Sequence, residues 1–224
     1  MNASDCHLDL GCGKFPRNPY GRGELYGVDI RPPPSAANFE HRVANLMLEP
    51  IPFADDSFAS ISAYDFIEHI PRVLATADGR DTLFPFVRLM QEIWRVLVPG
   101  GRFYAVTPAF PNPEAFVDPT HVNIITDKTH KYFCGEQPPG RMYGFQGQFE
   151  VVRAEWVHIH DVYSAIAGSP ENRSSRSGHR VLKNLSRQLR SLSRRLRGKP
   201  EPGRGKKKIY FLWELEVVKP VVHP

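Results

Sequence analysis

Four short apolar runs dominate the first third of the chain and predict strands of one sheet. They are residues 6–10 (CHLDL), 24–30 (ELYGVDI), 41–47 (HRVANLM) and 58–66 (FASISAYDF). Short, nearly continuous apolar runs are typical of parallel strands that are covered on both faces. We therefore expect residues 6–10 and 24–30 to be buried parallel strands, and residues 41–47 and 58–66 to be further strands of the same sheet.

A helical period follows the fourth run. Apolar residues recur on one helical face, at Leu83, Val87, Met90, Trp94 and Leu97. This spacing predicts an amphipathic helix, which Pro99-Gly100-Gly101 would end before a further strand at 102–108. Strands that alternate with helices indicate an open α/β sheet, whose ligand site lies beyond the carboxyl ends of the strands.

The connection between the first two strands is rich in glycine and proline. Residues 11–23 are too few and too broken for an ordinary crossover helix. Gly11 and Gly13 lack the third glycine of a dinucleotide fingerprint, because Pro16 stands in its place, and no Gly-Lys-Ser/Thr of a phosphate-binding loop follows. We expect a nucleoside ligand without a pyrophosphate, with Asp29 accepting hydrogen bonds from the ribose hydroxyls.

Five segments in order resemble the successive motifs of class I S-adenosylmethionine-dependent methyltransferases. They are LDLGCG (8–13), YGVDI (26–30), IPFADDSF (51–58), YDFIEHI (64–70) and RVLVPGGRFYAVTP (95–108). The family implies a three-layer, Rossmann-like α/β fold around a seven-stranded, mostly parallel sheet whose last strand is antiparallel and inserted between two parallel ones. Residues 150–160 and 208–218 would supply the closing hairpin of this sheet.

The resemblance implies S-adenosylmethionine as the cofactor. It gives nine binding residues: Asp9, Gly11, Cys12, Gly13, Asp29, Ile30, Asn45, Leu46 and Asp65. In the family pattern, Gly11 and Gly13 would approach the methionine and sugar parts of the cofactor, and Asp9 would support their turn. This sequence departs from the pattern at Phe15, where a third glycine is usual.

The other cofactor contacts implied by the resemblance follow the second, third and fourth strands. Asp29 would bind the ribose hydroxyls, with Ile30 beside it among the binding residues, and Asn45 and Leu46 would flank the adenine. Asp65 would lie near the amino end of the methionine. An acidic residue is common in the family at the position of Asn45.

Candidate catalytic groups lie in the segment after the fifth strand. Methyl transfer needs mainly alignment, and a base is needed only where the acceptor carries a proton that must leave. His121 follows Asp118-Pro119-Thr120 and is the candidate base, because histidine titrates near neutral pH. The alternative is that His121 bonds a nearby carbonyl and orders the loop. Asp118 and His69 are the candidate substrate-binding residues, with a structural role as the alternative for His69.

We expect no metal in this protein. His158, His160 and Asp161 could ligate one, but no third convergent ligand joins the two histidines. Cys134, with His130 nearby, lacks a CxxC partner, and Cys12 fits its turn as a small residue rather than as a nucleophile. Three widely spaced cysteines favour a reducing compartment without a disulfide framework.

Positive charge is concentrated near the carboxyl end. The whole chain of 224 residues carries a net charge of +5, yet residues 173–208 hold 14 Lys or Arg and one acidic residue. Leucines recur there at helical spacing, at Leu182, Leu185, Leu189, Leu192 and Leu196. We expect a methyltransferase domain at 1–168 plus 208–224, interrupted by a basic helical insertion at 169–207.

Three roles are open for the basic insertion. It could cap the domain, lie on an anionic membrane surface, or follow nucleic-acid phosphates. Its lack of aromatic residues counts against single-stranded RNA.

The sequence as a whole predicts a cytoplasmic methyltransferase, with a peripheral membrane location as one option. The chain shows neither a signal peptide nor an apolar run long enough for a membrane span. The expected reaction is O-methylation of a small-molecule, glycan or other saccharide-like acceptor. The alternatives are a nucleic-acid methyltransferase that uses residues 173–208, a non-catalytic protein that binds S-adenosylmethionine, and, more distantly, a nicotinamide dehydrogenase.

Overall fold

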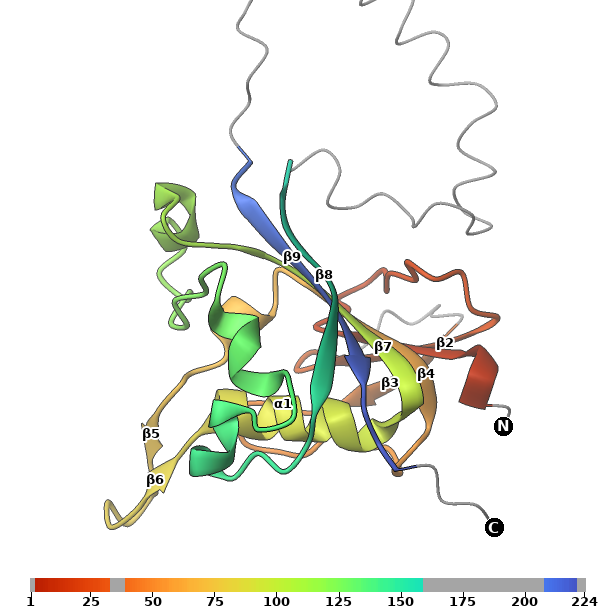
Figure 1. Ribbon diagram of the computed structural model, residues 1–224, viewed down its shortest axis with the longest axis horizontal. Helices are drawn as coiled ribbons and strands as arrows, with labels where there is room; N and C mark the ends of the chain where they lie inside the picture. The colour runs from red at the N-terminus through yellow and green to blue at the C-terminus, as the bar shows by residue number, and fades with distance from the viewer. Residues whose placement is uncertain (1–2, 33–38, 159–207, 221–224) are drawn as a thin grey trace, which may run out of the picture.

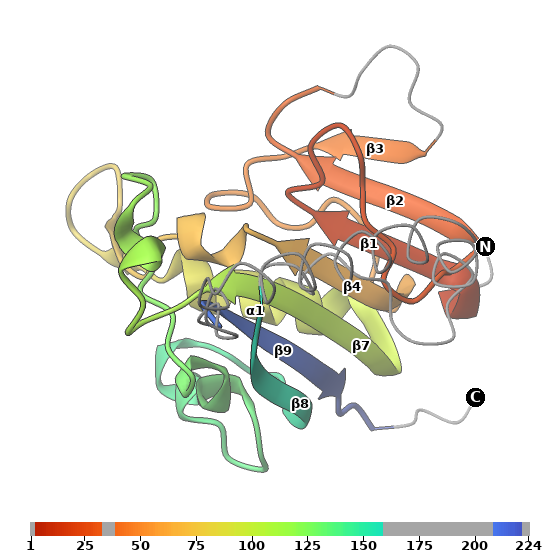
Figure 2. The same cartoon turned by 90° about the horizontal axis from the view of Figure 1, so that it is seen from above.

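The structure, a computed structural model, describes residues 3–32, 39–158 and 208–220 (Figure 1). Its centre is a seven-stranded sheet with the order β3-β2-β1-β4-β7-β9-β8. The strands are β1 (Cys6–Leu10), β2 (Glu24–Asp29), β3 (Glu40–Val43), β4 (Phe58–Tyr64), β7 (Leu97–Pro108), β8 (Phe149–Val157) and β9 (Tyr210–Val217). Figure 2 shows them fanned out from β3 at one edge to β8 at the other.

The strand directions confirm the predicted sheet. β1, β2, β3, β4 and β7 pair in parallel, whereas β9 pairs antiparallel with both β7 and β8. The strand latest in the sequence is therefore inserted, antiparallel, between two strands that share the common direction. This order brings the ends of β1, β2, β3 and β4 together at one edge of the sheet.

The described connections contain one α-helix and several short 3-10 helices. Helix α1 (Pro85–Val96) follows a two-stranded hairpin made by β5 (Leu74–Ala75) and β6 (Thr82–Leu83). The 3-10 helices are η1 (Ala3–Asp5), η2 (Ile67–His69), η3 (Pro113–Phe116), η4 (Thr129–Phe133) and η5 (Pro139–Tyr143). The last three lie in the long connection between β7 and β8.

Helix α1 covers one face of the sheet with a buried face that overlaps the predicted one only in part. Its buried residues are Pro85, Phe86, Leu89, Met90, Ile93 and Val96. Of the predicted face, Met90 is buried and Val87 and Trp94 pack partly buried against the core, whereas Leu83 lies in β6 and Leu97 begins β7. Trp94 is only partly buried, because it lies where its indole N–H donates to the carbonyl of Val218, 3.1 Å away.

The opposite face of the sheet carries a smaller apolar cluster. Tyr104, Val106 and Leu212 are buried there, and Tyr20 from the connection 11–23 packs edge-on against Tyr104. As expected, this connection contains no helix. Among the described residues the second face is therefore covered by a loop, and no α-helix forms a third layer on it.

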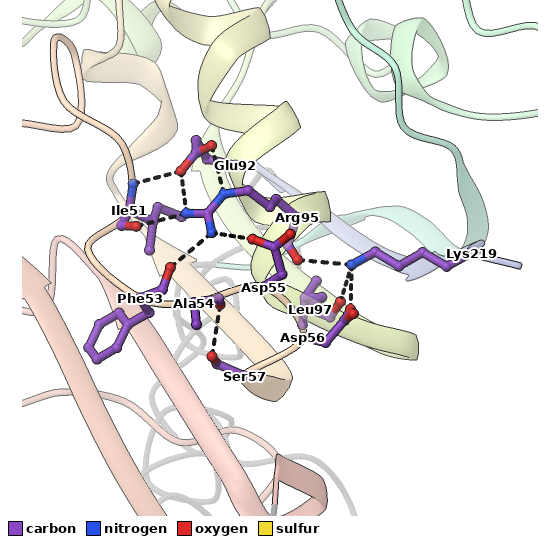
Figure 3. Close-up of polar contacts among 10 residues, drawn as sticks. All are labelled: Ile51, Phe53, Ala54, Asp55, Asp56, Ser57, Glu92, Arg95, Leu97 and Lys219. Carbon is purple, nitrogen blue, oxygen red and sulfur yellow. Dashed lines mark hydrogen bonds and ion pairs between the residues drawn. The ribbon is translucent and has the colours of Figure 1, made fainter. Parts of the chain in front are cut away.

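An ion-pair network ties α1 to the loop before β4 (Figure 3). The guanidinium of Arg95 bonds Glu92 on the same helix and Asp55 on the loop. Lys219, just after β9, bonds Asp56 at 2.6 Å and the carbonyl of Leu97 at 2.7 Å. These contacts join the helix, the loop and the end of the last strand at the edge where α1 ends and β4 begins.

Several predictions fall outside the described residues. The basic insertion at 169–207 and the residues His160 and Asp161 are among them.

None of the three cysteines forms a disulfide. In the parts of the chain that the structure describes, no helix combines the length and apolarity that a membrane crossing requires.

Candidate functional site

A cavity of about 320 Å³ lies at the carboxyl ends of β1, β2, β3 and β4. Each strand contributes the residues that follow it or end it. The lining residues are Gly11, Val28, Asp29, Ile30, Arg31, Ala44, Asn45, Leu46, Met47, Asp65, Phe66, His69 and Ile70. The cavity is thus formed where an open parallel sheet is expected to bind its ligand.

Six of the nine predicted cofactor residues line this cavity: Gly11, Asp29, Ile30, Asn45, Leu46 and Asp65. The other three, Asp9, Cys12 and Gly13, support the turn instead of lining the cavity. The N–H of Gly13 donates to Asp29 Oδ2 at 2.9 Å, and Cys12 is buried beside it. Burial raises the pKa of the Cys12 thiol to about 12, which argues against a role as a nucleophile.

Asp29 is held as a buried carboxylate at the edge of the cavity. Its Oδ1 accepts from the N–H of Arg31 at 2.9 Å, while its Oδ2 accepts from Gly13. Burial acts to raise the pKa of Asp29, but the N–H groups of Arg31 and Gly13 and the Arg31 side chain outweigh it and keep this pKa below the usual value. A charged acceptor with lone pairs to spare suits the hydroxyls of a ribose.

Asp9 fixes the glycine-rich connection from below. Its Oδ2 accepts from the N–H of Arg17 at 2.8 Å, and its Oδ1 accepts from the Ser62 hydroxyl at 2.5 Å. Because that hydroxyl proton points to Asp9, the Ser62 oxygen is free to accept from His7 Nε2, 2.9 Å away. Burial raises the pKa of Asp9 to about 7 and lowers that of His7 to about 3.

Gly11 is the point of closest approach in the turn. It has φ of +65°, and a Cβ placed there would lie 2.5 Å from Cδ2 of Phe66, a residue that lines the cavity. Gly13 also has positive φ, +55°, but a Cβ there would meet no atom within 4 Å. Both glycines therefore have a positive φ that disfavours other residues. Only at Gly11 would a side chain also clash with a neighbouring residue, Phe66.

We expect Gly11→Ala to weaken the binding of S-adenosylhomocysteine, the cofactor product, by about tenfold or more, equal to about 1.4 kcal/mol. The new methyl group would push Phe66 into the cavity. Gly13→Ala is the matched control, because it imposes the same backbone strain of about 1–2 kcal/mol without a clash. Calorimetric titration of both variants tests this. Equal losses of affinity in the two would contradict the assigned approach of Gly11.

A second group of polar residues lies beside the cavity, where η2 meets the connection after β7. The rings of His69 and His121 pack edge to face with centroids 4.7 Å apart. His121 Nδ1 lies 3.0 Å from the carbonyl oxygen of Ala115, and its Nε2 lies 3.9 Å from Asp118 Oδ2. The structure thus brings together all three predicted catalytic and substrate-binding residues, although only His69 lines the cavity itself.

Glu68 belongs to the same group, although it was not among the site residues predicted from the sequence. Its side chain is 1% exposed, and its Oε2 accepts from the Thr107 hydroxyl at 2.9 Å. Burial raises the pKa of Glu68 to about 8. One feature of the sequence could have pointed to Glu68: it is an acidic residue beside His69 in a segment that is otherwise apolar. Such residues are rarely buried unless they are paired or belong to a functional site.

A larger cavity, of about 510 Å³, lies between the start of α1 and the helices η4 and η5. Aromatic residues form much of its wall: Phe84, Phe86, Tyr132, Phe133 and Tyr143. Arg72 and Lys128 add positive charge to its lining. A cavity of this size and composition suits a small organic ligand.

Comparisons with known proteins agree with this arrangement. Residues 8–105 match the model of a family described as a methyltransferase domain. A methyltransferase from Haloferax volcanii, in complex with the Trm112 methyltransferase activator, is 14% identical, with 98% of this chain and 85% of that chain covered and a TM-score of 0.51.

Two further solved structures are similar at lower TM-scores. A SAM-dependent methyltransferase from Archaeoglobus fulgidus is 15% identical, with 94% of this chain and 85% of that chain covered and a TM-score of 0.46. Phosphoethanolamine N-methyltransferase 2 from Haemonchus contortus, in complex with S-adenosyl-L-methionine, is 14% identical, with 98% and 50% covered and a TM-score of 0.45. No curated protein sequence matches significantly.

Proposed function

We propose that this chain is a class I S-adenosylmethionine-dependent methyltransferase, as the match of residues 8–105 to a methyltransferase domain supports, and that it methylates a hydroxyl oxygen of a small-molecule or saccharide-like acceptor. The observation that carries the proposal is the pair of histidines, His69 and His121, beside the cofactor cavity. A hydroxyl acceptor carries a proton that must leave during transfer, and a histidine close to the reacting atoms can take it.

The cofactor cavity fits S-adenosylmethionine by its donor set. Asp29 offers a charged acceptor for the ribose hydroxyls, and Leu46 and Ile30 offer apolar surface for the adenine. Asp65, at the end of β4, would hold the amino group of the methionine. When bound, S-adenosylmethionine supplies a sulfonium-activated methyl group, so the chain needs mainly to align the acceptor and exclude water.

His121 has the tautomer that a base requires. A carbonyl oxygen only accepts, so His121 Nδ1 carries the hydrogen that it donates to Ala115, and the lone pair is on Nε2. In the proposed step Nε2 accepts the hydroxyl proton while the acceptor oxygen bonds the methyl carbon. The electron pair of the broken carbon–sulfur bond passes to sulfur.

The aromatic cavity is the proposed place for the body of the acceptor. Arg72 lines this cavity and lies three residues after His69, which lines the cofactor cavity. One short segment therefore contributes to both cavities. Tyr132 and Tyr143 stack with ring centroids 6.4 Å apart. Flat aromatic surfaces of this kind suit the apolar face of a sugar ring or an aromatic alcohol.

The test is the release of S-adenosylhomocysteine from S-adenosylmethionine with panels of phenols, sugars and oligosaccharides, and with tRNA and duplex DNA. We expect turnover with a hydroxyl acceptor from the first group and an ether as the product. Turnover with nucleic acid alone, lost when residues 173–208 are deleted and steeply reduced by salt, would replace this proposal with the nucleic-acid alternative. Cofactor binding without turnover in any panel would favour a protein that only senses the cofactor.

A further inference from the structure

We propose that Glu68, His69 and His121 form a binding site for a divalent first-row transition-metal ion. Each of the three offers one ligand atom, and these atoms all lie within 4.8 Å of one another. Two imidazoles and one carboxylate on one side of an ion form a familiar ligand set with open positions opposite. This inference reverses the expectation from sequence, which considered His158, His160 and Asp161 as metal ligands but not these three residues.

Both histidines present the nitrogen that a metal needs. His121 Nδ1 donates to the Ala115 carbonyl at 3.0 Å, and His69 Nδ1 donates to the Thr120 carbonyl at 3.2 Å. Each ring therefore has its lone pair on Nε2. A backbone carbonyl behind the ligating ring is the usual way in which proteins fix the tautomer and orientation of a metal-binding histidine.

Thr120 and Asp118 strengthen this orientation. The Thr120 hydroxyl donates to Asp118 Oδ1 at 2.7 Å, so its oxygen can accept from His69 Nδ1 at 3.0 Å. The other carboxylate oxygen of Asp118 lies 3.9 Å from His121 Nε2. Asp118 thus adds negative charge at the rim of the cluster, where it favours a cation.

Glu68 supplies the observation that points most directly to a cation. Its Oε2 is bonded by Thr107, but its Oε1 is buried and has no hydrogen-bond partner among the described residues. A buried carboxylate oxygen without a partner is costly. No basic side chain pairs with Glu68 in the described part of the chain, and an ion held between Glu68 and the two imidazole rings would supply the missing partner.

The backbone holds the three ligands in place from two separate segments. Glu68 and His69 belong to η2, after β4, whereas His121 lies on the connection after β7. Asn123 joins these segments: its N–H donates to the Glu68 carbonyl at 2.9 Å, and its Nδ2 donates to the Ile67 carbonyl at 3.1 Å. The site is therefore preorganised by contacts that do not involve the ligand atoms.

The ligand set selects the type of ion. Imidazole nitrogens suit Zn²⁺, Fe²⁺, Ni²⁺ or Cu²⁺, whereas Mg²⁺ and Ca²⁺ prefer oxygen ligands throughout. Two nitrogens and one carboxylate oxygen leave positions for water or for an acceptor oxygen. We expect Zn²⁺ to bind at least tenfold more tightly than Mg²⁺.

The role of the ion rests on the proposed function. Because His69 also lines the cofactor cavity, an acceptor hydroxyl that coordinates the ion would lie beside the methyl donor. The ion lowers the pKa of that hydroxyl, whose proton passes to solvent. The resulting alkoxide bonds the methyl carbon, the carbon–sulfur electron pair goes to sulfur, and the ion keeps its oxidation state. With the ion bound, His121 acts as its ligand rather than as the base.

Calorimetric titration of the chelator-treated full-length protein with ZnCl₂, and separately with MgCl₂, tests the site. We expect one Zn²⁺ per chain at this site and an affinity that falls by at least about tenfold in His121→Ala and in Glu68→Gln. His158→Ala is the matched control, because it removes a histidine of the competing HIHD segment, and its zinc affinity should stay within about twofold of the wild type.

No zinc binding by the wild type, unchanged binding in His121→Ala, or a loss confined to His158→Ala would overturn the proposal. If Glu68→Gln fails to fold, the zinc affinity of His121→Ala alone tests the site. His121 lies on the connection after β7, outside the sheet, and urea unfolding checks that the His121→Ala variant is folded. The titration contains neither cofactor nor acceptor. Zinc binding without hydroxyl methylation would therefore refute only the proposed function, and methylation by a protein that binds no zinc would refute only the metal site.

Discussion

His121→Ala is expected to slow methyl transfer by about 10²–10⁴-fold and to leave the affinity for S-adenosylhomocysteine within about twofold of the wild type. His121 Nε2 carries the lone pair at the group formed by Glu68, His69 and His121, so its loss removes the proton acceptor of the metal-free site, or one ligand of the inferred ion when that ion is bound. The residue does not line the cofactor cavity, which is why binding should be spared. Single-turnover rates with the best hydroxyl acceptor from the panel give the measurement.

His158→Ala serves as the control for this prediction, because it removes a histidine that does not line the described cavities. Added imidazole should restore part of the activity of His121→Ala if Nε2 acts directly at the acceptor. A His121→Ala enzyme that turns over at the wild-type rate would contradict both roles of this residue. A loss of cofactor binding in the variant would show that His121 is structural instead.

Arg95→Met is expected to lower the free energy of unfolding by about 3–5 kcal/mol. The Arg95 side chain is 24% exposed, and its guanidinium bonds the Glu92 carboxylate at 2.6 and 2.9 Å (Figure 3). It also donates to the carbonyls of Ile51 and Phe53, both at 2.9 Å. Methionine fills similar volume but leaves these partly buried acceptors, and the Asp55 carboxylate at 2.7 Å, without their donor.

Urea unfolding followed by circular dichroism measures this loss. Arg42→Met is the matched control, because Arg42 bonds Glu40 at 2.8 Å but both side chains are substantially exposed, at 53% and 40%. We expect a cost of at most about 1 kcal/mol there. Similar costs in the two variants would mean that the network around Arg95 is no more than a surface ion pair.

Most of the sheet was predictable from local pattern. The runs at 6–10, 24–30 and 58–66 became β1, β2 and β4 because continuous apolar segments of this length satisfy a strand covered on both faces. The missing first crossover helix was predictable from Pro16 and Pro19. The antiparallel position of β9 came from the family resemblance, since no local signal distinguishes it from a parallel strand.

The face of α1 was predicted only in part: Met90, Val87 and Trp94 pack against the core as expected, but the ends of the helix were not. Leu83 and Leu97 share a period with Met90 but lie outside the helix, which begins at Pro85 and ends at Val96. Phe86 and Ile93, one position away from the predicted stripe, are more deeply buried than Val87 and Trp94. Trp94 lies at the edge of the buried face, where its indole N–H donates to the carbonyl of Val218.

The cofactor cavity could be anticipated residue by residue, but the polar cluster could not. Gly11 follows β1 and Asp29 ends β2, so the topology alone places them at one edge. Glu68 and His121 are 53 positions apart in the sequence, and their meeting depends on the backbone bonds made by Asn123. The contacts of Arg95 could not be predicted from the sequence either, because its partners other than Glu92 are about 40 residues away.

Calorimetric titration with S-adenosylhomocysteine, with NAD as the comparison ligand, tests the central claim most directly. The account predicts saturable binding of one S-adenosylhomocysteine per chain and no binding of NAD. Asp29→Ala should weaken the binding by about 1–3 kcal/mol, because a charged acceptor of the ribose hydroxyls is lost. Binding of NAD in preference to S-adenosylhomocysteine, or an unchanged affinity in a folded Asp29→Ala variant, would contradict the assignment of this cavity to S-adenosylmethionine.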